Sequence, residues 1–331
     1  MSLPNLIYFL PTYIDLQNDV SRQKVFIKNV LEADIVAART ENDGSLDDED
    51  FTKIRKYYGF GVPAIVGEGF CALRGQTMTA TERLTSTYQG ALTGLYDDFF
   101  DKTLKSAEDI RAMMDDPANF HPASSLEKLF IHFLRKVHAG IPDKAFFSAA
   151  FDKVYQAQLD TGRQLSPSIS WDEIREITFR KGGVSLLFYR SAFTHVLQSG
   201  EEKALYEAGG LMQLGNDIFD VYKDEKQGIR TFLTACEHIG QVREEFNTQL
   251  RKTLSSILEI NYPQAQQKRY LQKLLLGISR CWVCLDKLEK LEVKSGGYFR
   301  PAGYSREEMI CDMEIPANML RSIKYYLSYH L

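Results

Sequence analysis

Acidic side chains recur at helical spacing in the stretch GALTGLYDDFFDKTL, residues 90–104. A helix turns about 100° and rises about 1.5 Å per residue, so Asp97 and Asp101 lie one turn apart on one face, with Asp98 beside them. Like charges at this spacing repel by roughly 0.2–0.5 kcal/mol per pair, and no basic residue stands among the three. The pattern predicts either a solvated helix end or a site that binds a cation.

A second acidic group lies in MQLGNDIFDVYKDEKQGIR, residues 212–230. Asn216, Asp220 and Asp224 follow one another at intervals of four, which places their oxygens in a line about 12 Å long on one helix face. Hard oxygen donors without His or Cys companions favour Mg²⁺ and disfavour zinc. Because each acidic group is too sparse to saturate a cation, we expect metal ions between the two groups, completed by a phosphorylated ligand.

Helices must position both groups, because apolar residues recur at helical spacing almost throughout and strand-like alternation is hard to find. With 331 residues, 44% hydrophobic and 25% charged, the chain is long enough for one large core. We expect an all-α fold, a single domain spanning residues 1–331 and built as a bundle of about ten helices. The predicted helices span residues 21–38, 47–59, 79–104, 124–139, 142–160, 171–198, 201–226, 239–261, 263–292 and 305–330, with a loop containing a short helix at 105–125.

Composition excludes several classes of protein. The net charge of −4 and the scattered basic residues argue against nucleic-acid binding. No window approaches 18 uninterrupted apolar residues, so no membrane span is expected. The odd number of cysteines and the lack of a secretory signal indicate a cytoplasmic setting. The Cys281-x-x-Cys284 spacing lacks a second ligand pair, so we interpret it as a buried helical thiol pair.

The two acidic motifs together resemble those of the class I isoprenoid synthases. DDFFD (97–101) fits the first family motif, Asp-Asp-x-x-Asp, at every required position. NDIFDVYKD (216–224) resembles the second motif of terpene cyclases, Asn-Asp-x-x-Ser-x-x-Lys-Glu, with Asp220 in place of Ser and Asp224 in place of Glu. It is also similar to the Asp-Asp-x-x-Asp of prenyltransferases, matched at Asp217 and Asp220, and to the acidic spacing of phytoene-type synthases. The order of the motifs, about 115 residues apart, agrees with the family.

The resemblance implies a helical bundle with a central active-site cavity in which both motifs hold Mg²⁺, three ions replaceable by Mn²⁺, against a prenyl diphosphate. The implied catalytic and metal residues are Asp97, Asp98, Asp101, Asn216, Asp217, Asp220 and Asp224. Basic residues complete the diphosphate site; the candidates are Arg175, Arg180, Lys181, Lys223, Arg230 and Arg300. A lid near the C-terminus would use Arg300, Tyr304 or Arg306. The pair Gly182-Gly183 predicts a break in its helix, as in this family.

A prenyl chain also needs an apolar pocket walled by aromatic rings that face cationic intermediates. The candidates on or near the motif-bearing helices are Phe70, Tyr88, Tyr96, Phe99, Phe188, Tyr189, Phe193 and Phe219. For each ring taken singly, helical spacing favours core packing over pocket lining.

Two motifs that the sequence lacks indicate which branch of the family it resembles. Condensing prenyltransferases hold a second diphosphate with a Gly-Lys-x-x-Arg-Pro segment and an Arg-Arg pair, and neither GEGFCALRGQTMTATERL (67–84) nor KTLKSAEDIRAMM (102–114) matches. We therefore favour a terpene cyclase or diphosphate lyase. The alternatives are a condensing prenyl diphosphate synthase, a head-to-head synthase of the squalene or phytoene type, and a non-catalytic helical binding subunit. The resemblance also allows a homodimer.

Overall fold

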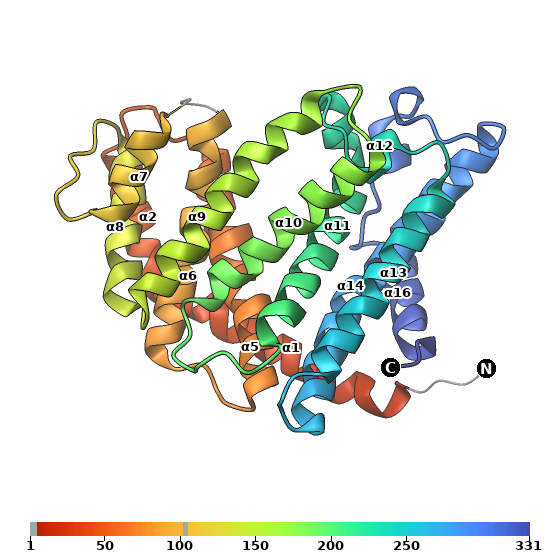
Figure 1. The fold of residues 1–331 in the computed structure, drawn as a ribbon, viewed down its shortest axis with the longest axis horizontal. Coiled ribbons are helices and arrows are strands. Elements are labelled where there is room, and N and C mark those ends of the chain that lie inside the picture. Colours follow the sequence, from red (N-terminus) through yellow and green to blue (C-terminus); the bar gives the residue numbers. More distant parts are fainter. Residues whose placement is uncertain (1–4, 102–104) are drawn as a thin grey trace. The chain divides into compact units, whose positions relative to one another are not determined.

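The computed structural model describes residues 5–101 and 105–331, and all regular secondary structure in that part of the chain is helical, which confirms the all-α prediction (Figure 1). The order is α1 (Leu6–Phe26), η1 (Ile27–Leu31), α2 (Glu32–Thr40), α3 (Asp48–Thr52), η2 (Lys53–Tyr58), α4 (Gly59–Gly61), η3 (Val62–Gly67), α5 (Glu68–Arg74), α6 (Ala80–Asp101), α7 (Ala107–Asp115), α8 (Ser125–Gly140), α9 (Lys144–Thr161), η4 (Gly162–Leu165), α10 (Trp171–Arg190), α11 (Glu201–Gln227), α12 (Phe232–Ala235), α13 (Ile239–Leu258), α14 (Gln264–Lys294), η5 (Pro301–Gly303), α15 (Arg306–Met309) and α16 (Pro316–Ser328). The segments η1, η2 and η3 are π-helical; η4 and η5 are 3₁₀ turns.

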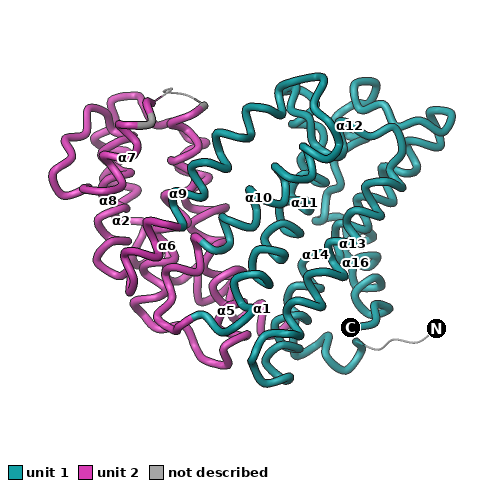
Figure 2. The backbone as a smooth tube through the Cα atoms, in the orientation of Figure 1, with its two compact units in different colours: residues 1–12, 150–187, 197–331 teal, residues 13–149, 188–196 magenta. Residues whose placement is uncertain are grey.

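The chain forms two compact units (Figure 2). Unit 1 comprises Met1–Thr12, Ala150–Leu187 and Leu197–Leu331, and unit 2 comprises Tyr13–Ala149 and Phe188–Val196. The first acidic motif belongs to unit 2 and the second to unit 1. The expectation of a single domain with a central cavity stays a prediction.

Unit 1 is built around α11, the helix that carries the second motif. Helix α11 packs against α13, α13 against α14, and α14 against α16, and the last three run side by side in Figure 1. Fully buried side chains such as Leu214, Ile218 and Val221 line the core face of α11, and Phe246 of α13 meets Trp282 of α14 edge-on with ring centroids 5.5 Å apart. This burial fixes which face of α11 remains for polar chemistry.

The predicted break at Gly182-Gly183 is wrong, because α10 is one helix from Trp171 to Arg190. The two glycines instead allow close packing on α11. A Cβ at Gly182 would lie 2.1 Å from the carbonyl oxygen of Gly209, and a Cβ at Gly183 would lie 2.5 Å from the ring of Tyr206. Glycine is therefore needed here for the approach of two helices rather than for a bend.

Unit 2 is built around α6, the helix that carries the first motif. It packs against α8, where Phe99 meets Phe130 edge-on with centroids 4.9 Å apart, and along the segment from η2 to η3. A Cβ at Gly90 would lie 2.4 Å from the carbonyl oxygen of Tyr58, and a Cβ at Gly94 would lie 3.3 Å from Cβ of Lys53. The glycines in the motif's own stretch thus allow η2 to lie close to α6.

Several predicted helix boundaries need correction. The first helical stretch begins at Leu6 rather than residue 21, and continues past Pro11. Helix α10 ends at Arg190 rather than 198. The predicted helix 305–330 is two helices, because Ser305 caps the short α15 and Pro316 occupies the first turn of α16. Residues 102–104 of the predicted helix 79–104 lie outside the described residues.

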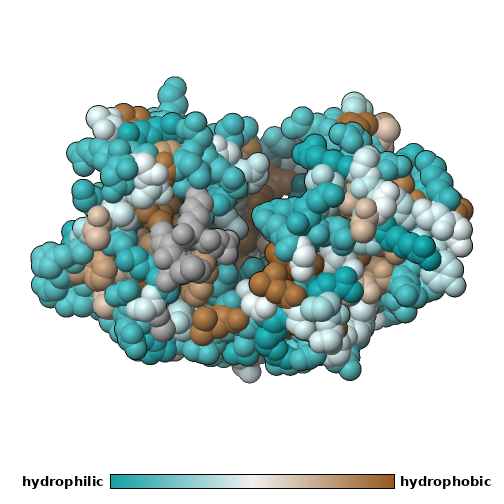
Figure 3. Space-filling model, turned by 90° about the horizontal axis from the view of Figure 1, so that it is seen from above, coloured by the Kyte–Doolittle hydropathy of each residue, from teal (hydrophilic) through white to brown (hydrophobic). Residues whose placement is uncertain are grey.

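Within the described ranges, no helix is long and apolar enough to cross a membrane. The face drawn in Figure 3 is mostly hydrophilic, with apolar residues in small groups. This agrees with the expectation that the chain has no membrane span.

Candidate functional site

The second acidic motif occupies one face of α11 near its C-terminal end. Asn216 is exposed, and its Nδ2 donates a hydrogen bond to Oδ2 of Asp220 over 3.1 Å. Asp217 is buried, and its two oxygens accept from Oγ1 of Thr178 (3.2 Å) and from Nε2 of Gln213 (2.8 Å). Asp217 is thus held by neutral donors.

Helix α11 ends directly after this motif. Gly228 adopts φ of +69°, and its N–H donates to the carbonyl of Glu225 over 3.2 Å, while the N–H of Ile229 donates to the carbonyl of Asp224 over 2.9 Å. A left-handed glycine at this position is a common helix terminator. The last motif residue, Asp224, therefore lies in the final turn of α11, where the helix dipole disfavours a negative charge.

Burial and mutual repulsion disfavour ionisation of this cluster. Burial raises the pKa of Asp217 to about 6. Burial and then repulsion from Asp217 and Asp220 raise the pKa of Asp224 to about 8. Burial also raises the pKa of Asp220, and Lys223 and Lys181 act in the opposite direction. Without a further positive charge, the folded chain favours the protonated form of Asp224 far more than an exposed aspartate does.

A hard cation fits this cluster by its chemistry. Among the described residues, Lys181 and Lys223 act on Asp220 and Asp224 through charge, and no basic side chain forms an ion pair with either carboxylate. Carboxylate oxygens are ligands that Mg²⁺ prefers. The described residues hold no group of three or more His, Cys, Asp or Glu side chains gathered closely enough to bind a metal by themselves. The site on α11 would therefore hold a cation by few protein ligands, with water or substrate oxygens supplying the others.

The basic residues predicted for diphosphate differ in their engagement. Arg175 contacts Glu245 through Nε (3.1 Å) and Nη2 and also contacts Asp172, so its guanidinium is already neutralised. Arg180 pairs with Asp160 over 2.6 Å. Lys181 instead lies near enough to Asp217, Asp220 and Asp224 to lower the pKa of all three. Of the three, Lys181 is the one that the structure brings to the acidic cluster.

Of the remaining predicted basic residues, Lys223 belongs to the motif on α11, and Arg230 and Arg300 follow it in unit 1. Lys223 is exposed on α11 and lowers the pKa of Asp220 and Asp224. Arg230 donates from Nη1 to the carbonyl of Thr234 over 2.7 Å, while its buried Nε has no hydrogen-bond partner among the described residues. Arg300 is exposed, with its guanidinium 5.8 Å from the ring centre of Tyr298.

In the first motif, the missing counter-charge comes from another helix. Asp98 is 1% exposed, and its Oδ1 lies 3.4 Å from Nζ of Lys53 in η2. Asp97 is half-buried, and its charge contributes to raising the pKa of Tyr189, an effect dominated by burial. The side chain of Asp101 lies outside the described residues. Asp98 therefore faces η2 inside unit 2.

The predicted pocket aromatics are mostly core residues with ring partners. Phe70 meets Phe193 (5.3 Å between centroids) and Phe188 meets Phe147 (5.3 Å), with Tyr96 beside Phe100 (5.2 Å) and Phe99 beside Phe130. Phe219 is partly buried against the core of unit 1. These contacts favour packing for each ring, and pocket lining stays a prediction.

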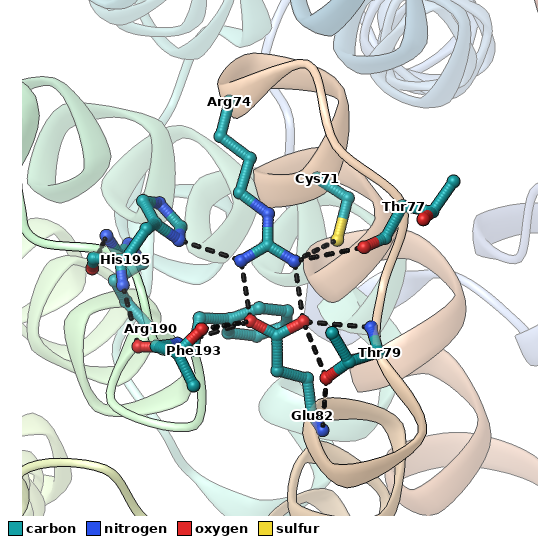
Figure 4. A network of polar contacts seen from close by, with 9 residues as sticks. Cys71, Arg74, Thr77, Thr79, Glu82, Arg190, Phe193 and His195 are labelled. Carbon is teal, nitrogen blue, oxygen red and sulfur yellow. Dashed lines mark hydrogen bonds and ion pairs between the residues drawn. The ribbon is translucent and has the colours of Figure 1, made fainter.

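A buried ion pair in unit 2 went unnoticed in the sequence. Figure 4 shows the Arg74 guanidinium over the Glu82 carboxylate, with two hydrogen bonds of 2.6 Å between them and Nδ1 of His195 2.9 Å from NH1 of Arg74. Both Thr79 and Thr194 donate to Glu82 through N–H and hydroxyl. Burial opposes ionisation, yet these donors outweigh it and lower the pKa of Glu82 to about 2. The capping-box spacing of Thr79 and Glu82 was the only sequence signal.

The two motifs thus differ in how their charge is balanced. The first has Lys53 against Asp98, whereas in the second Lys181 and Lys223 lower the pKa values of Asp220 and Asp224 without outweighing the effect of burial. No family model, curated protein or solved structure matches this chain.

Proposed function

We propose that the chain is a Mg²⁺-dependent class I terpene synthase that ionises a linear prenyl diphosphate to an allylic carbocation and releases diphosphate. The acidic cluster on α11 carries the proposal. Asp224, with a pKa raised to about 8, shares its face with Asp220 and Asn216 and has no paired base among the described side chains. Such a cluster gains most from a divalent cation, because the cation offsets the repulsion between the neighbouring carboxylates of Asp220 and Asp224.

In this proposal, the oxygen-bearing residues of the two motifs bind the metal ions. Asn216, Asp220 and Asp224 on α11, together with Asp97 and Asp101, would hold Mg²⁺. Bound Mg²⁺ would supply Lewis-acid stabilisation of the charge that develops on the departing diphosphate.

The neighbouring side chains orient the acidic cluster and attract an anionic substrate. Thr178 and Gln213 fix Asp217, which then acts as a buried partner of the cluster rather than as a ligand. Lys181 and Lys223 supply positive charge to an anionic substrate at the same face of α11. In unit 2, Lys53 lies 3.4 Å from Asp98 and lowers the cost of the buried charge on that motif residue.

Internal ion pairs favour a single-diphosphate substrate over condensation. A condensing enzyme needs basic groups for a second diphosphate, and the segment preceding the first motif offers few. Arg74 is bound to Glu82, Arg83 contacts Glu68, and Lys53 contacts Asp98. These cations balance internal carboxylates and would have to give up buried partners to bind a second anion.

Turnover assays separate the possible functions. Purified protein is incubated with Mg²⁺ and geranyl, farnesyl or geranylgeranyl diphosphate, and inorganic diphosphate and hydrocarbon products are measured. We expect Mg²⁺-dependent diphosphate release with a hydrocarbon from one substrate alone. Product formation only after a second diphosphate is added would establish condensation instead. No turnover with any chain length would favour a binding subunit.

Asp97→Ala and Asn216→Ala should each abolish turnover while helix content, measured by circular dichroism, stays unchanged. Each change removes one cation ligand from one motif. The matched control is Glu225→Gln, which removes an acid from α11 outside the motif and should retain activity. Full activity in both alanine variants would reject the assigned site.

A further inference from the structure

The start of α1 exposes apolar side chains and buries polar ones. Asn5 and Thr12 are buried, whereas Ile7 is 73% exposed and Leu10 is 61% exposed. A helix that packs on a protein core normally has the opposite distribution. Ile7 and Leu10 lie about one turn apart, so their side chains form one row on the exposed face, with Leu6 (56% exposed) beside them. These three residues, the α1 row, form an apolar surface that unit 1 does not cover.

The buried side of this segment is fastened to α14 and α16. Asn5 Nδ2 donates to the carbonyls of Tyr326 (2.8 Å) and Tyr329 (2.7 Å), and Asn5 Oδ1 accepts from Nε2 of Gln272 over 2.9 Å. The ring of Phe9 lies 5.8 Å from that of Tyr326, measured between centroids. The start of α1 therefore lies against the end of α16, as Figure 1 also shows. These contacts fix which face of α1 is exposed.

Helix α16 also has an exposed outer face. Ser322 and Tyr326 are buried, and Ser322 Oγ lies 2.8 Å from Oγ of Ser279 on α14. Leu320 is 67% exposed, and Lys324, one turn further along, is exposed as well. Helix geometry places both on the side opposite Ser322. An apolar side chain and a base thus share the outer face of α16.

The three segments that meet at Asn5 carry positive charge only. Residues 5–12, 264–285 and 315–331 contain no Asp or Glu, although the whole chain has 44 such residues and a net charge of −4. Their basic residues are Lys268, Arg269, Lys273, Arg280, Arg321 and Lys324. This part of unit 1 is therefore locally basic in a chain that is acidic as a whole.

Two of these bases flank the residues that hold Asn5. Lys268 precedes Gln272 by one helical turn, and Lys324 precedes Tyr326 by two positions. Both lysines are exposed. Positive charge therefore lies at the surface close to the α1 row.

We propose that the α1 row binds the surface of an anionic lipid bilayer without crossing it. The apolar side chains would enter the boundary between headgroups and acyl chains, while Lys268 and Lys324 would contact lipid phosphates. Tyr8, 39% exposed on the same helix, suits this depth because tyrosine combines an apolar ring with a polar hydroxyl.

Charge favours a lipid surface over a second copy of this chain. In a symmetric dimer the same patch meets itself, so the basic groups around the α1 row of one copy would face those of the other. Like charges brought together across an interface cost free energy, whereas anionic headgroups attract both lysines.

Vesicle flotation tests the proposal. The whole chain is mixed with vesicles of phosphatidylcholine and phosphatidylglycerol in equal parts, or with vesicles of phosphatidylcholine alone. We expect the protein to float with the anionic vesicles and to stay behind with the neutral ones. Added salt should release it, because charges are screened over about 10 Å at 0.1 M ionic strength and over about 3 Å at 1 M.

Paired variants assign the binding to the α1 row. Ile7→Gln combined with Leu10→Gln should lower the vesicle partition coefficient about tenfold or more, because two apolar side chains no longer leave water. Val293→Gln is the matched control, since it removes an exposed aliphatic side chain near the end of α14 and should leave partition unchanged.

Charge reversal gives a second, independent route. Lys268→Glu combined with Lys324→Glu should abolish binding to the anionic vesicles, whereas Lys290→Glu, an exposed base outside this region, should keep it. Circular dichroism checks that each variant folds, and the charge variants decide the matter if the glutamine variant does not fold.

Three results would overturn the proposal. They are wild-type protein that floats with neither kind of vesicle, equal binding to both kinds, and wild-type binding by the folded Ile7→Gln, Leu10→Gln variant. If the wild type does not float and sedimentation shows a dimer that this variant abolishes, the α1 row is instead a contact between copies. Flotation needs no substrate, so these results do not depend on whether the chain turns over a prenyl diphosphate.

Discussion

At the scale of single residues, the buried acids of α11 make stability depend on pH. Folding raises the pKa of Asp224 from 3.8 to about 8 and that of Asp217 to about 6. A raised carboxyl pKa means that the folded state binds the proton more tightly than the unfolded state. Stability therefore falls as pH rises from about 4 to about 8, and the cost is complete above the folded pKa.

Asp224→Asn should stabilise the folded chain at pH 8 by several kcal/mol, because the amide removes the buried charge and its repulsion. At pH 4, where the wild-type acid is protonated, the two proteins should unfold alike. Urea unfolding at both pH values measures the difference. Glu225→Gln serves as the control, and an equal stability of Asp224→Asn and wild type at pH 8 would contradict the electrostatic account.

For the buried Arg74–Glu82 ion pair, removing one charge should destabilise the folded chain rather than stabilise it. Removing one partner leaves the other charge buried, which costs about 3–5 kcal/mol. Arg74→Met and Glu82→Gln should each destabilise the chain strongly, and the double variant should be more stable than the sum of the two losses predicts. A double-mutant cycle by urea unfolding measures this coupling, and additive losses would show that the pair is not coupled.

Glu82 also sets the direction of acid sensitivity. Its pKa is lowered to about 2, so its contribution to stability is present above about 4.5 and is lost as pH falls towards 2. The loss should be absent in Glu82→Gln. Acid titration followed by far-ultraviolet circular dichroism compares the two proteins.

At the scale of elements, glycine residues allow α10 and α11 to pack closely against each other. Gly182→Ala places a Cβ 2.1 Å from a backbone carbonyl of α11, so the helices must separate. We expect a loss of about 1–3 kcal/mol, which is typical of overpacking. The matched control is Gly277→Ala in α14, where the Cβ meets open space and the higher helix propensity of alanine should stabilise the chain by up to about 1 kcal/mol. Thermal unfolding of both variants decides between packing and a hinge role for Gly182.

The same glycines show what the sequence could and could not predict. The spacing of apolar residues and the length of each stretch predicted five helices within a few residues, because an amphipathic helix has apolar residues at regular intervals of three and four. These helices are α6, α8, α11, α13 and α14. The sequence does not show which segment packs against a glycine. Gly182 was therefore interpreted as a break, although the missing Cβ makes room for α11. The start of α1 was missed because Pro11 normally interrupts a helix.

The candidate site was predictable only where chemistry follows local spacing. The acids of α11 share one face because helix geometry requires it. Contacts between segments far apart in the sequence could not be predicted. Lys53 forms an ion pair with Asp98, 45 positions away, and Glu245 accepts hydrogen bonds from Arg175, 70 positions away. Spacing likewise predicted a buried helical thiol pair at Cys281 and Cys284, and both residues lie buried on α14.

At the scale of the whole molecule, the two compact units have separate cores. Unit 1 centres on α11, α13 and α14, and unit 2 on α6 and α8. Each unit carries one acidic motif. The proposed function requires both motifs to act on one substrate, which can be tested through binding without any turnover.

Mg²⁺ with inorganic diphosphate should raise the melting temperature of the wild type more than either component alone. A ligand that binds only the folded state stabilises it by about 2.7 kcal/mol at 100 times its dissociation constant. In a chain of this size, that gain corresponds to several degrees. Asp97→Ala and Asn216→Ala should each lose the joint effect, since each motif supplies part of the cation site, whereas Glu225→Gln should keep it. A joint shift that survives in Asp97→Ala but disappears in Asn216→Ala would confine binding to unit 1, and the chain would then bind diphosphate through α11 alone.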